Sequence, residues 1–551
     1  MDFVITHFGA RPNSGEDTAP PVLAALERCR GQKGSRLIFP KGRYHFYREK
    51  ALERLLWTSN NDGGIKRIGI PLLSLDGLEL DGEGSEFIFH GRMVPLAVWD
   101  SSNIRLTRFS IDWDRPFTLE GEVLDQKQDH LDVRMSPATP YVIREGRISG
   151  LDDDCYPQRH ITLIEYDPRR QELAFDTAYP WGLNCAEEIE PGCVRLKMRG
   201  AALKVGRTVL MRMEQRHSPA MSIGRSAEVA LCDVAIHAAA GMGLIAQESR
   251  DLHLDNLRIT PTPNSGRILS TQDDATHFCN CRGHILMENC LFENCWDDGG
   301  NIHGIYRVVN QRGPNWVVSD TRHFQQMGTG MGEQDDDLIE FVDPATMRTI
   351  HEGRGYEFIV YNPHYTATSL REPLPESVKV GTCIANLSAT PDLTIRRCVI
   401  RNTRPRGVLI NTPGKVVVEE NTFHTPGAAV LIGADCNSWY ESGAVRDILI
   451  RRNVFDNCRF MRETCTPAQV SIIPAIPEAG RGQPFERNIR IEQNTFRAFD
   501  PLLVKARSVD GLTFRDNVIV ENSDYPPYSG KSGPLDIEDC VNVVIEGNES
   551  R

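Results

Sequence analysis

Short segments that alternate apolar and polar residues recur along the C-terminal half of the chain. The strings VVVEENTF, ILIRRNVF and IRIEQNTF end at Phe423, Phe455 and Phe496. Each has apolar residues at alternate positions, then two polar residues, an Asn and a second apolar pair. Alternation with a period of two predicts short strands that bury one face. Helical periodicity is weak outside residues 19–29, so the pattern predicts an all-β chain.

The Asn, or a Cys in its place, marks the same phase in each repeat. The marked positions are Cys290, Cys398, Asn421, Asn453, Asn494, Asn517 and Asn548, and Phe109, Val234 and Leu257 fill the position in earlier turns. The shortest spacing is 23 residues, as from position 398 to 421. Repeats of this length can bury their apolar faces only against neighbouring turns, which predicts a solenoid.

The strand positions favour Val, Ile and Phe, so we predict a parallel β-helix. A leucine-rich repeat is the competing fold, and it is disfavoured because no L-x-x-L-x-L frame recurs. An Asn amide carries both hydrogen-bond donors and acceptors, so the stacked Asn side chains are expected to form a ladder.

Two long gaps interrupt the repeat. Phe109 to Val234 spans 125 residues, and Cys290 to Cys398 spans 108. Both gaps hold short alternating strands and turn signals, so each is expected to form a small antiparallel β module. The predicted limits are 112–200 for the first module and 308–390 for the second. The β-helix is then formed by residues 1–111, 201–307 and 391–551.

The first forty residues carry a different pattern. The segment FGA-x-P at 8–12 and a short helical stretch to Arg30 precede LIFP-x-G-x-Y at 37–44. This resembles the first turn of β-helix polysaccharide enzymes of the pectin-lyase-like group. The resemblance implies that the helix caps the open end of the solenoid and protects a sheet edge.

Composition and charge narrow the class of function. The formal net charge is 62 − 75 = −13, which disfavours a nucleic-acid-binding protein. No apolar run is long enough to span a membrane. The 15 cysteines are scattered without metal-ligand spacing, which favours buried free thiols. No signal peptide is visible, so the protein is expected to be cytoplasmic, or secreted or periplasmic with its leader removed.

Two pairs of acidic residues are the candidate chemistry. Asp273-Asp274 and Asp297-Asp298 are accompanied by His277, Asn301 and His303. Position 274 lies 23 residues before 297, one turn, so these two aspartates are expected to stack on adjacent turns, about 4.8 Å apart. Like charges so close raise one pKa, which lets one carboxyl act as an acid while another stays a base. Without a cofactor motif this favours glycoside hydrolysis. A lyase that holds Ca²⁺ with four aspartates stays open.

Three linked segments carry a resemblance to a known family. They are DDATHF-x-N-C-R-G at 273–283, MENCLF at 287–292 and DDG-x-N-x-H-G at 297–304. Together they resemble glycoside hydrolase family 110, bacterial exo-α-1,3-galactosidases that remove terminal galactose from blood group B structures. The resemblance covers essentially the whole chain. It implies a right-handed parallel β-helix with two inserted β-barrel modules and an inverting mechanism.

The resemblance also implies site residues. Asp274, Asp297 and Asp298 match the catalytic carboxylates; we assign Asp297 as general acid and let the other two share the water as general base. Inversion requires about 6.5–9.5 Å between acid and base, so a lateral offset is expected. No metal or cofactor is expected. The candidate substrate-binding residues are Arg267, Asp273, His277, Trp296, Asn301, His303, Arg404, Arg406, Asn411 and Trp439.

The expected partner is a galactose-terminated oligosaccharide or glycoconjugate, either the branched B antigen or linear Gal-α-1,3-Gal. The alternatives are a polysaccharide lyase or polygalacturonase-like hydrolase on the same fold, and a non-catalytic carbohydrate-binding solenoid. An acidic polymer needs a basic groove, which the net charge of −13 disfavours. A binding solenoid does not need the three carboxylates. A homodimer through the β modules stays open.

Overall fold

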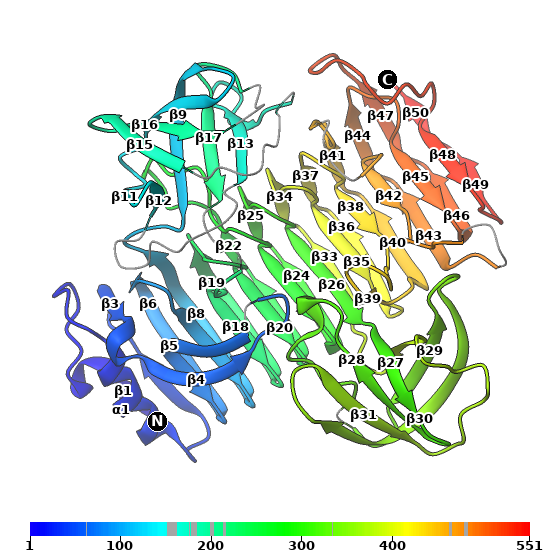
Figure 1. Ribbon diagram of the computed structural model, residues 1–551, viewed down its shortest axis with the longest axis horizontal. Coiled ribbons are helices and arrows are strands. Elements are labelled where there is room, and N and C mark those ends of the chain that lie inside the picture. The colour runs from blue at the N-terminus through cyan, green and yellow to red at the C-terminus, as the bar shows by residue number, and fades with distance from the viewer. Residues whose placement is uncertain are drawn as a thin grey trace.

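The computed structural model describes residues 1–61, 63–150, 162–175, 177, 185–198, 203–212, 216–332, 334–461, 466–478 and 483–551. Its elements are almost all strands, so the prediction of an all-β chain is confirmed. The strands stack turn on turn into a parallel β-helix with two side modules, as predicted (Figure 1). None of the described helices has the length and apolarity needed to cross a membrane.

One wall of the β-helix, which we call the ladder sheet, has two successive strand rows. The first row comprises β6 (Asp76–His90), β8 (Ser102–Trp113), β19 (Ala227–Ile236), β21 (Arg250–Asp255), β24 (Arg282–Glu288), β33 (Asp392–Arg396), β36 (Lys415–Glu419), β40 (Asp447–Arg451), β43 (Glu486–Glu492), β46 (Val509–Arg515) and β49 (Val544–Glu546). The second row comprises β22 (Arg258–Ile259), β25 (Leu291–Glu293), β34 (Val399–Arg401), β37 (Thr422–His424), β41 (Val454–Asp456), β44 (Thr495–Ala498), β47 (Val518–Glu521) and β50 (Glu549–Ser550). A polar corner separates the two rows.

The opposite wall, which we call the site sheet, has one parallel strand per turn. Its strands are β7 (Val94–Trp99), β18 (Met221–Gly224), β20 (Leu244–Gln247), β23 (Thr276–Cys279), β26 (Gly300–Ile305), β35 (Val408–Asn411), β38 (Val430–Ile432), β42 (Val470–Ile472), β45 (Val504–Arg507) and β48 (Leu535–Glu538). The antiparallel strands β4 (Leu52–Trp57) and β5 (Gly63–Leu73) extend it at the N-terminal end.

The space between the two sheets is filled by columns of identical or similar apolar side chains. Phe423, Phe455 and Phe496 stack with ring centroids 5.4 and 4.7 Å apart and are fully buried. Burial of one such side chain stabilises the fold by roughly 1.5–3 kcal/mol. Because each turn contributes the same residue at the same phase, the core is continuous along the solenoid.

The predicted Asn ladder is present at the corner of the ladder sheet. The backbone amide and the side-chain Nδ2 of Asn421 both donate to Oδ1 of Asn453 at 3.0 Å, and Nδ2 also donates to the Ile395 carbonyl oxygen. The same pattern links Asn453, Asn494, Asn517 and Asn548. The ladder satisfies polar groups that would otherwise be buried without partners.

Cysteines continue this column towards the N-terminus. The backbone amide of Cys398 donates to Oδ1 of Asn421, while its thiol and that of Cys290 contact backbone carbonyl oxygens. The thirteen described cysteines are free, and ten of them are buried, as expected for small hydrophobic residues. Cys155 and Cys465 lie outside the described residues.

The first inserted module is an antiparallel sheet. Its strand order is β14 (Glu172–Leu173), β13 (Thr162–Asp167), β17 (Thr208–Arg212), β9 (Thr118–Gln126), β10 (His130–Met135), β16 (Cys193–Lys197) and β15 (Cys185–Glu190), with a hairpin of β11 (Val142–Arg144) and β12 (Arg147–Ser149) beside it. The structure places β17 in this module, beyond the sequence-derived limit of 200. The pairing of β17 with β9 is the reason, and a short apolar run carries no signal for its pairing partner.

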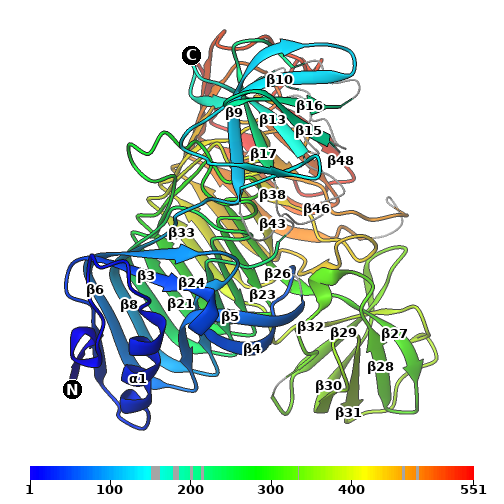
Figure 2. The same cartoon turned by 60° about the vertical axis from the view of Figure 1, so that its left-hand side comes forward.

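The second module is a closed barrel. Its strands are β27 (Arg307–Arg312), β28 (Trp316–Asp320), β31 (Tyr365–Leu370), β30 (Arg348–Val360), β29 (Leu338–Asp343) and β32 (Cys383–Asn386). A short 3-10 helix, η3 (Phe324–Gln326), follows β28. Figures 1 and 2 show the two modules as separate bodies projecting from the solenoid.

The helix α1 (Ala19–Cys29) lies at the N-terminal end of the solenoid, as Figure 2 shows. Its buried residues Ala19, Val22, Ala25 and Leu26 belong to the same apolar core as the sheets. The helix therefore covers the first turn, as the N-terminal pattern predicted. Around it, β1 (Asp2–Val4), β2 (Ser35–Ile38) and β3 (Arg43–Tyr47) complete that turn.

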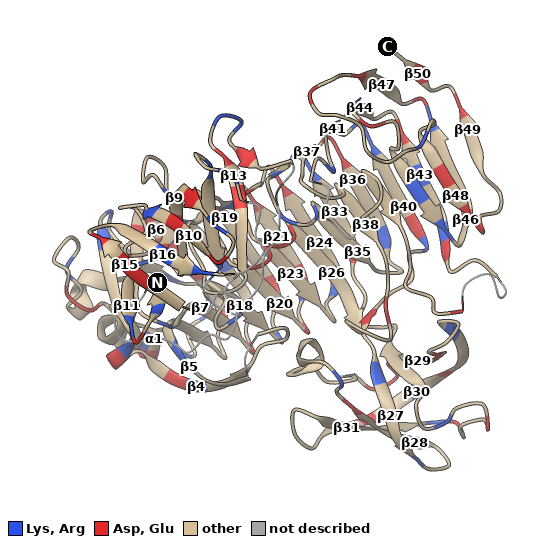
Figure 3. Ribbon diagram, turned by 45° about the horizontal axis from the view of Figure 1, so that its top comes forward, with Lys and Arg blue, Asp and Glu red and all other residues tan. Residues whose placement is uncertain are grey.

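Charged residues on the outer surface are interspersed in sign. Figure 3 shows acidic residues next to basic ones along the strands of the ladder sheet. Examples are Arg451 with Glu419 at 2.8 Å and Arg515 with Glu492 at 2.9 Å. Exposed pairs of this kind contribute about 0.2–1 kcal/mol each.

We expect Asn453→Ala to lower the free energy of unfolding by about 1–3 kcal/mol, because it leaves the amides of Asn421 without their acceptor. The matched control is Asn548→Ala at the end of the ladder, where water can replace the lost partner. Denaturant unfolding of both variants measures the difference. An equal loss at the two positions would contradict a cooperative interior ladder.

Candidate active site

The four aspartates lie where two neighbouring turns enter the site sheet. Thr276 of β23 pairs with Gly300 of β26, so counting back two residues on each strand aligns Asp274 with Asp298. The prediction that Asp274 stacks on Asp297 is therefore wrong by one residue. The 23-residue spacing was read from the ladder sheet. The corners that lead into the site sheet differ in length, so that spacing does not transfer to it.

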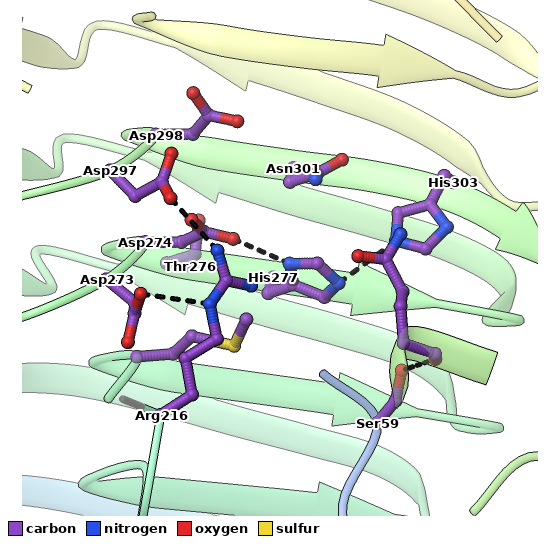
Figure 4. Close-up of polar contacts among 12 residues, drawn as sticks. Ser59, Arg216, Asp273, Asp274, Thr276, His277, Asp297, Asp298, Asn301 and His303 are labelled. Carbon is purple, nitrogen blue, oxygen red and sulfur yellow. Dashed lines mark hydrogen bonds and ion pairs between the residues drawn. The ribbon is translucent and has the colours of Figure 1, made fainter. Parts of the chain in front are cut away.

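The carboxyl groups nevertheless converge. One oxygen from each of Asp274, Asp297 and Asp298 lies within 4.8 Å of the other two (Figure 4). Consecutive residues of an extended strand point to opposite faces, so the last two converge because they precede β26 in a bend. Gly299 lets its turn lie close to the turn that contains Gly407, since a Cβ at Gly299 would meet the carbonyl oxygen of Gly407 at 2.6 Å.

Two arginines contact three of the four aspartates. Arg216 Nη2 lies 3.0 Å from Oδ2 of Asp297, and its Nε lies 3.0 Å from Oδ1 of Asp273. Arg406 donates two hydrogen bonds to Asp298, at 2.7 and 2.8 Å. Burial raises the pKa of Asp298, and this bidentate guanidinium opposes the rise, because charge-assisted pairs favour the ionised carboxylate.

A third arginine adds to this positive charge. Arg212, at the end of β17, donates to Asp273, so the first inserted module contributes directly to the site. Three carboxylate oxygens this close could hold a cation in principle. Guanidinium groups already contact Asp297 and Asp298 and supply compensating positive charge there.

Asp274 has a different partner, a chain of two histidines. His303 Nδ1 donates to the carbonyl oxygen of Gly304 at 2.7 Å. If the His303 ring is neutral, its Nε2 carries no hydrogen and is an acceptor. The Nε2 atoms of His303 and His277 lie 2.9 Å apart, so the hydrogen between them belongs to His277. His277 Nδ1 is in turn an acceptor, and the 2.6 Å contact requires Asp274 to donate an O–H.

The electrostatics of the site agree with this direction of donation. Burial lowers the pKa of both His277 and His303 to about 4, so both rings are neutral near pH 7. Burial, and then the nearby charge of Asp297, raise the pKa of Asp274 well above its usual range. At rest the site thus holds a protonated Asp274 beside carboxyls that contact guanidinium groups, and acid–base catalysis needs such unequal partners.

Glu441 lies beyond the histidines and is a further buried carboxylate. It belongs to β39 (Glu441–Ser442), which pairs with the end of β26. Its oxygens accept hydrogen bonds from Asn301 at 3.1 Å, Gln325 at 2.8 Å and Asn411 at 3.4 Å. Gln325 comes from η3 of the second module, so this carboxylate connects the barrel to the site sheet.

Comparisons with known proteins agree with this geometry. The family models described as GLAA-B β-barrel domain I and GLAA-B β-barrel domain II match residues 119–209 and 320–384. A relative from Shewanella woodyi named α-1,3-galactosidase A is 36% identical, over 99% of this chain and 90% of its own length. One from Bacteroides thetaiotaomicron named α-1,3-galactosidase B is 35% identical, with the same coverage of both chains.

The chain belongs to glycoside hydrolase family 110. The family resemblance found in the sequence is therefore confirmed. Among solved structures, an exopolygalacturonase from Thermotoga maritima aligns with a TM-score of 0.46 and 12% identity, covering 99% of this chain and 92% of its own.

In this member of family 110, most of the residues singled out in the sequence meet at the site. The cluster around the carboxylates contains Asp273, Asp274, His277, Asp297, Asp298, Asn301, His303 and Arg406. Asn411 joins it through Glu441, and the ring of Trp439 lies 5.7 Å from the guanidinium of Arg216.

Three other predicted residues lie elsewhere. Arg267 pairs with Asp112 of β8 at 2.5 Å. Trp296 is buried in an apolar cluster with residues of the first module, so it packs that module against the solenoid. Arg404 lines the same small cavity as Trp296. We therefore assign these three side chains to the module contact rather than to the sugar.

Sequence reasoning missed several residues of the site. Arg212 ends a strand of the first module, Arg216 follows that module and Gln325 lies in the second, where no repeat phase predicts position. One feature of the sequence does indicate the loop that contains Glu441. From Asn421 to Asn453 the spacing is 32 residues, nine more than the shortest turn, and the extra residues form the loop that carries this carboxylate.

The neutral histidines predict a loss of stability at low pH. Their folded-state pKa values of about 4 lie below the ordinary value of 6.5, so their contribution is present above pH 6.5 and is lost as the pH falls towards 4. The ionisable groups that act on this pair are Asp274, Glu441, Arg216 and Asp297. We expect His303→Gln to make the loss shallower, by roughly 1.4 kcal/mol per pH unit.

His424→Gln is the control with the opposite sign. Its hydrogen bond to Glu172 raises the pKa of His424 against the effect of burial, so that contribution is present at low pH and is lost as the pH rises. Removing it should make the loss on acidification steeper. Denaturant unfolding between pH 4.5 and 7.5 compares the three proteins, and parallel curves would contradict the neutral histidine pair.

Proposed function

We propose that the protein is an exo-acting α-1,3-galactosidase that releases terminal galactose from an oligosaccharide or glycoconjugate. The observation that carries the proposal is the buried carboxyl trio, in which one group holds a proton while another accepts hydrogen bonds from Arg406. The two relatives named α-1,3-galactosidase, at 36% and 35% identity over nearly the whole chain, support this activity.

Unpartnered polar atoms around the carboxyls support a sugar as the ligand. Asn301 Oδ1, Gln325 Oε1, Arg216 Nη1 and Asp273 Oδ2 are buried and make no hydrogen bond within the described chain. Buried polar atoms are normally paired, so this set indicates a ligand with several hydroxyl groups. The arginines that touch the trio are engaged by aspartates, so a neutral sugar fits better than a uronic acid.

The exposure of the three carboxyls supports Asp297 as the general acid. Its side chain is 14% exposed, against 3% for Asp274 and 1% for Asp298. The glycosidic oxygen is bonded to the remainder of the glycan, which extends into solvent, so its proton donor belongs at the outer side of the site.

The other two carboxyls would hold the attacking water. Oxygens no more than 4.8 Å apart can both contact one water at about 2.7 Å. Arg406 favours the anionic form of Asp298 through two hydrogen bonds, so we assign Asp298 as the principal base. One oxygen of Asp274 donates its hydrogen bond to His277, so the other oxygen of Asp274 can accept a hydrogen bond from the water. A single displacement by this water would invert the anomeric carbon, but the expected lateral offset is not present between the nearest oxygens of acid and base, which lie within 4.8 Å instead of about 6.5–9.5 Å.

Proton NMR of the hydrolysis of Gal-α-1,3-Gal tests the activity and the mechanism together. We expect β-galactose as the first product. The α anomer appearing first would retain the galactosidase and overturn inversion, whereas no release would overturn the function. Incubation of an acidic polysaccharide with Ca²⁺ tests the lyase alternative, which would produce an unsaturated product that absorbs in the ultraviolet.

Asp297→Asn should reduce kcat for the disaccharide by at least about 10³-fold, because the leaving sugar then departs without a proton. A substrate with an acidic leaving group, such as 2,4-dinitrophenyl α-galactoside, should lose far less. Asp298→Asn should lose activity with both substrates, because the water must still be deprotonated. Asp335→Asn, an exposed residue of the second module, is the control. Equal losses for Asp297→Asn on both substrates would overturn the acid assignment.

A further inference from the structure

Two exposed aromatic rings lie beside the carboxyl cluster and have no part in the chemistry described above. Phe324 of η3 is 39% exposed, and Trp439, in the loop between β38 and β39, is 43% exposed. Their ring centroids lie 6.4 Å apart, and the His323 ring lies 4.8 Å from that of Trp439. The pair therefore comes from segments more than one hundred residues apart.

Both rings are held in place by the residues around them. The backbone amide of Trp439 donates to Asp435 at 2.6 Å, and the same carboxylate accepts from the amides of Asn437 and Ser438. At the start of the 3-10 helix, the His323 side chain accepts from the backbone amide of Gln325 at 3.2 Å, and the backbone amide of His323 donates to Oε1 of Gln326 at 2.7 Å. A rigid aromatic surface loses little conformational entropy when a ligand packs on it.

The position of the pair relates it to the scissile bond. The guanidinium of Arg216 lies 5.9 Å from the Phe324 centroid and 5.7 Å from the Trp439 centroid, within the range of a cation–π contact. The same guanidinium lies 3.0 Å from Asp297. One side chain thus separates the aromatic pair from the carboxyl that we assign as the proton donor.

We propose that Phe324 and Trp439 form a subsite for the second sugar, the ring that leaves after cleavage. This inference rests on the proposed function, because the leaving sugar begins at the oxygen that Asp297 protonates. A pyranose ring presents an apolar face of C–H groups, which packs on aromatic rings. Held, partly exposed aromatics next to a polar site are the surface that such a face needs. The second module then contributes to specificity by presenting η3.

Two substrates separate this subsite from the galactose site. Gal-α-1,3-Gal places a sugar on the aromatic pair, whereas α-galactosyl fluoride has no second ring and needs no strong acid. We expect Trp439→Ala and Phe324→Ala each to lower kcat/KM for the disaccharide roughly 3- to 10-fold relative to α-galactosyl fluoride, mainly through KM. Trp439→Phe and Phe324→Tyr should restore most of the ratio. Trp316→Ala, an equally exposed aromatic of the second module, should leave the ratio unchanged.

Each outcome decides the proposal. An unchanged ratio in both alanine variants would overturn the subsite, and so would equal losses on both substrates, which would mean that the rings only shield Arg216. If one alanine variant fails to fold, the other and the two conservative variants still report the ratio. Failure of the wild-type protein to cleave either substrate would instead overturn the proposed galactosidase activity.

Discussion

The backbone hydrogen bonds that stack β26 on β23 are the interaction on which the site depends. They set two aspartates on adjacent turns and hold their side chains at strand spacing, whatever the sequence of the loops around them. Carboxyl groups at that distance cannot all ionise without compensation. The other groups of the site offset this electrostatic cost.

The cost is offset in two ways, and each way applies to different carboxyl groups. Arginines compensate the charge of Asp273, Asp297 and Asp298. Asp274 keeps its proton and donates a hydrogen bond to a neutral histidine. Guanidinium pairing preserves charge on one side of the cluster, and burial removes it on the other. Unequal protonation thus follows from unequal partners, although all four residues are aspartates on neighbouring turns.

The sequence predicts the solenoid well because its signal is periodic. The Asn at 421 and its counterparts repeat at the phase where a buried amide ladder forms, so fold class and core follow from the pattern. The register between Asp274 and Asp298 does not follow, because it depends on corner length rather than on period. Arg216 and Gln325 escaped prediction for a related reason: they follow or lie within an insertion, and tertiary folding alone brings them to the site.

The periodic solenoid and its insertions contribute differently to the site. The solenoid supplies a rigid wall on which few residues can change, since a Cβ at Gly299 would already strike the neighbouring turn. Insertions are not bound by that constraint, because they need only reach the wall from outside. Arg212 and Phe324 reach the site from such segments, whereas Arg406 and the two histidines belong to the turns of the solenoid. Backbone stacking therefore sets the spacing of the carboxyls, while the groups around them come from both the solenoid and its insertions.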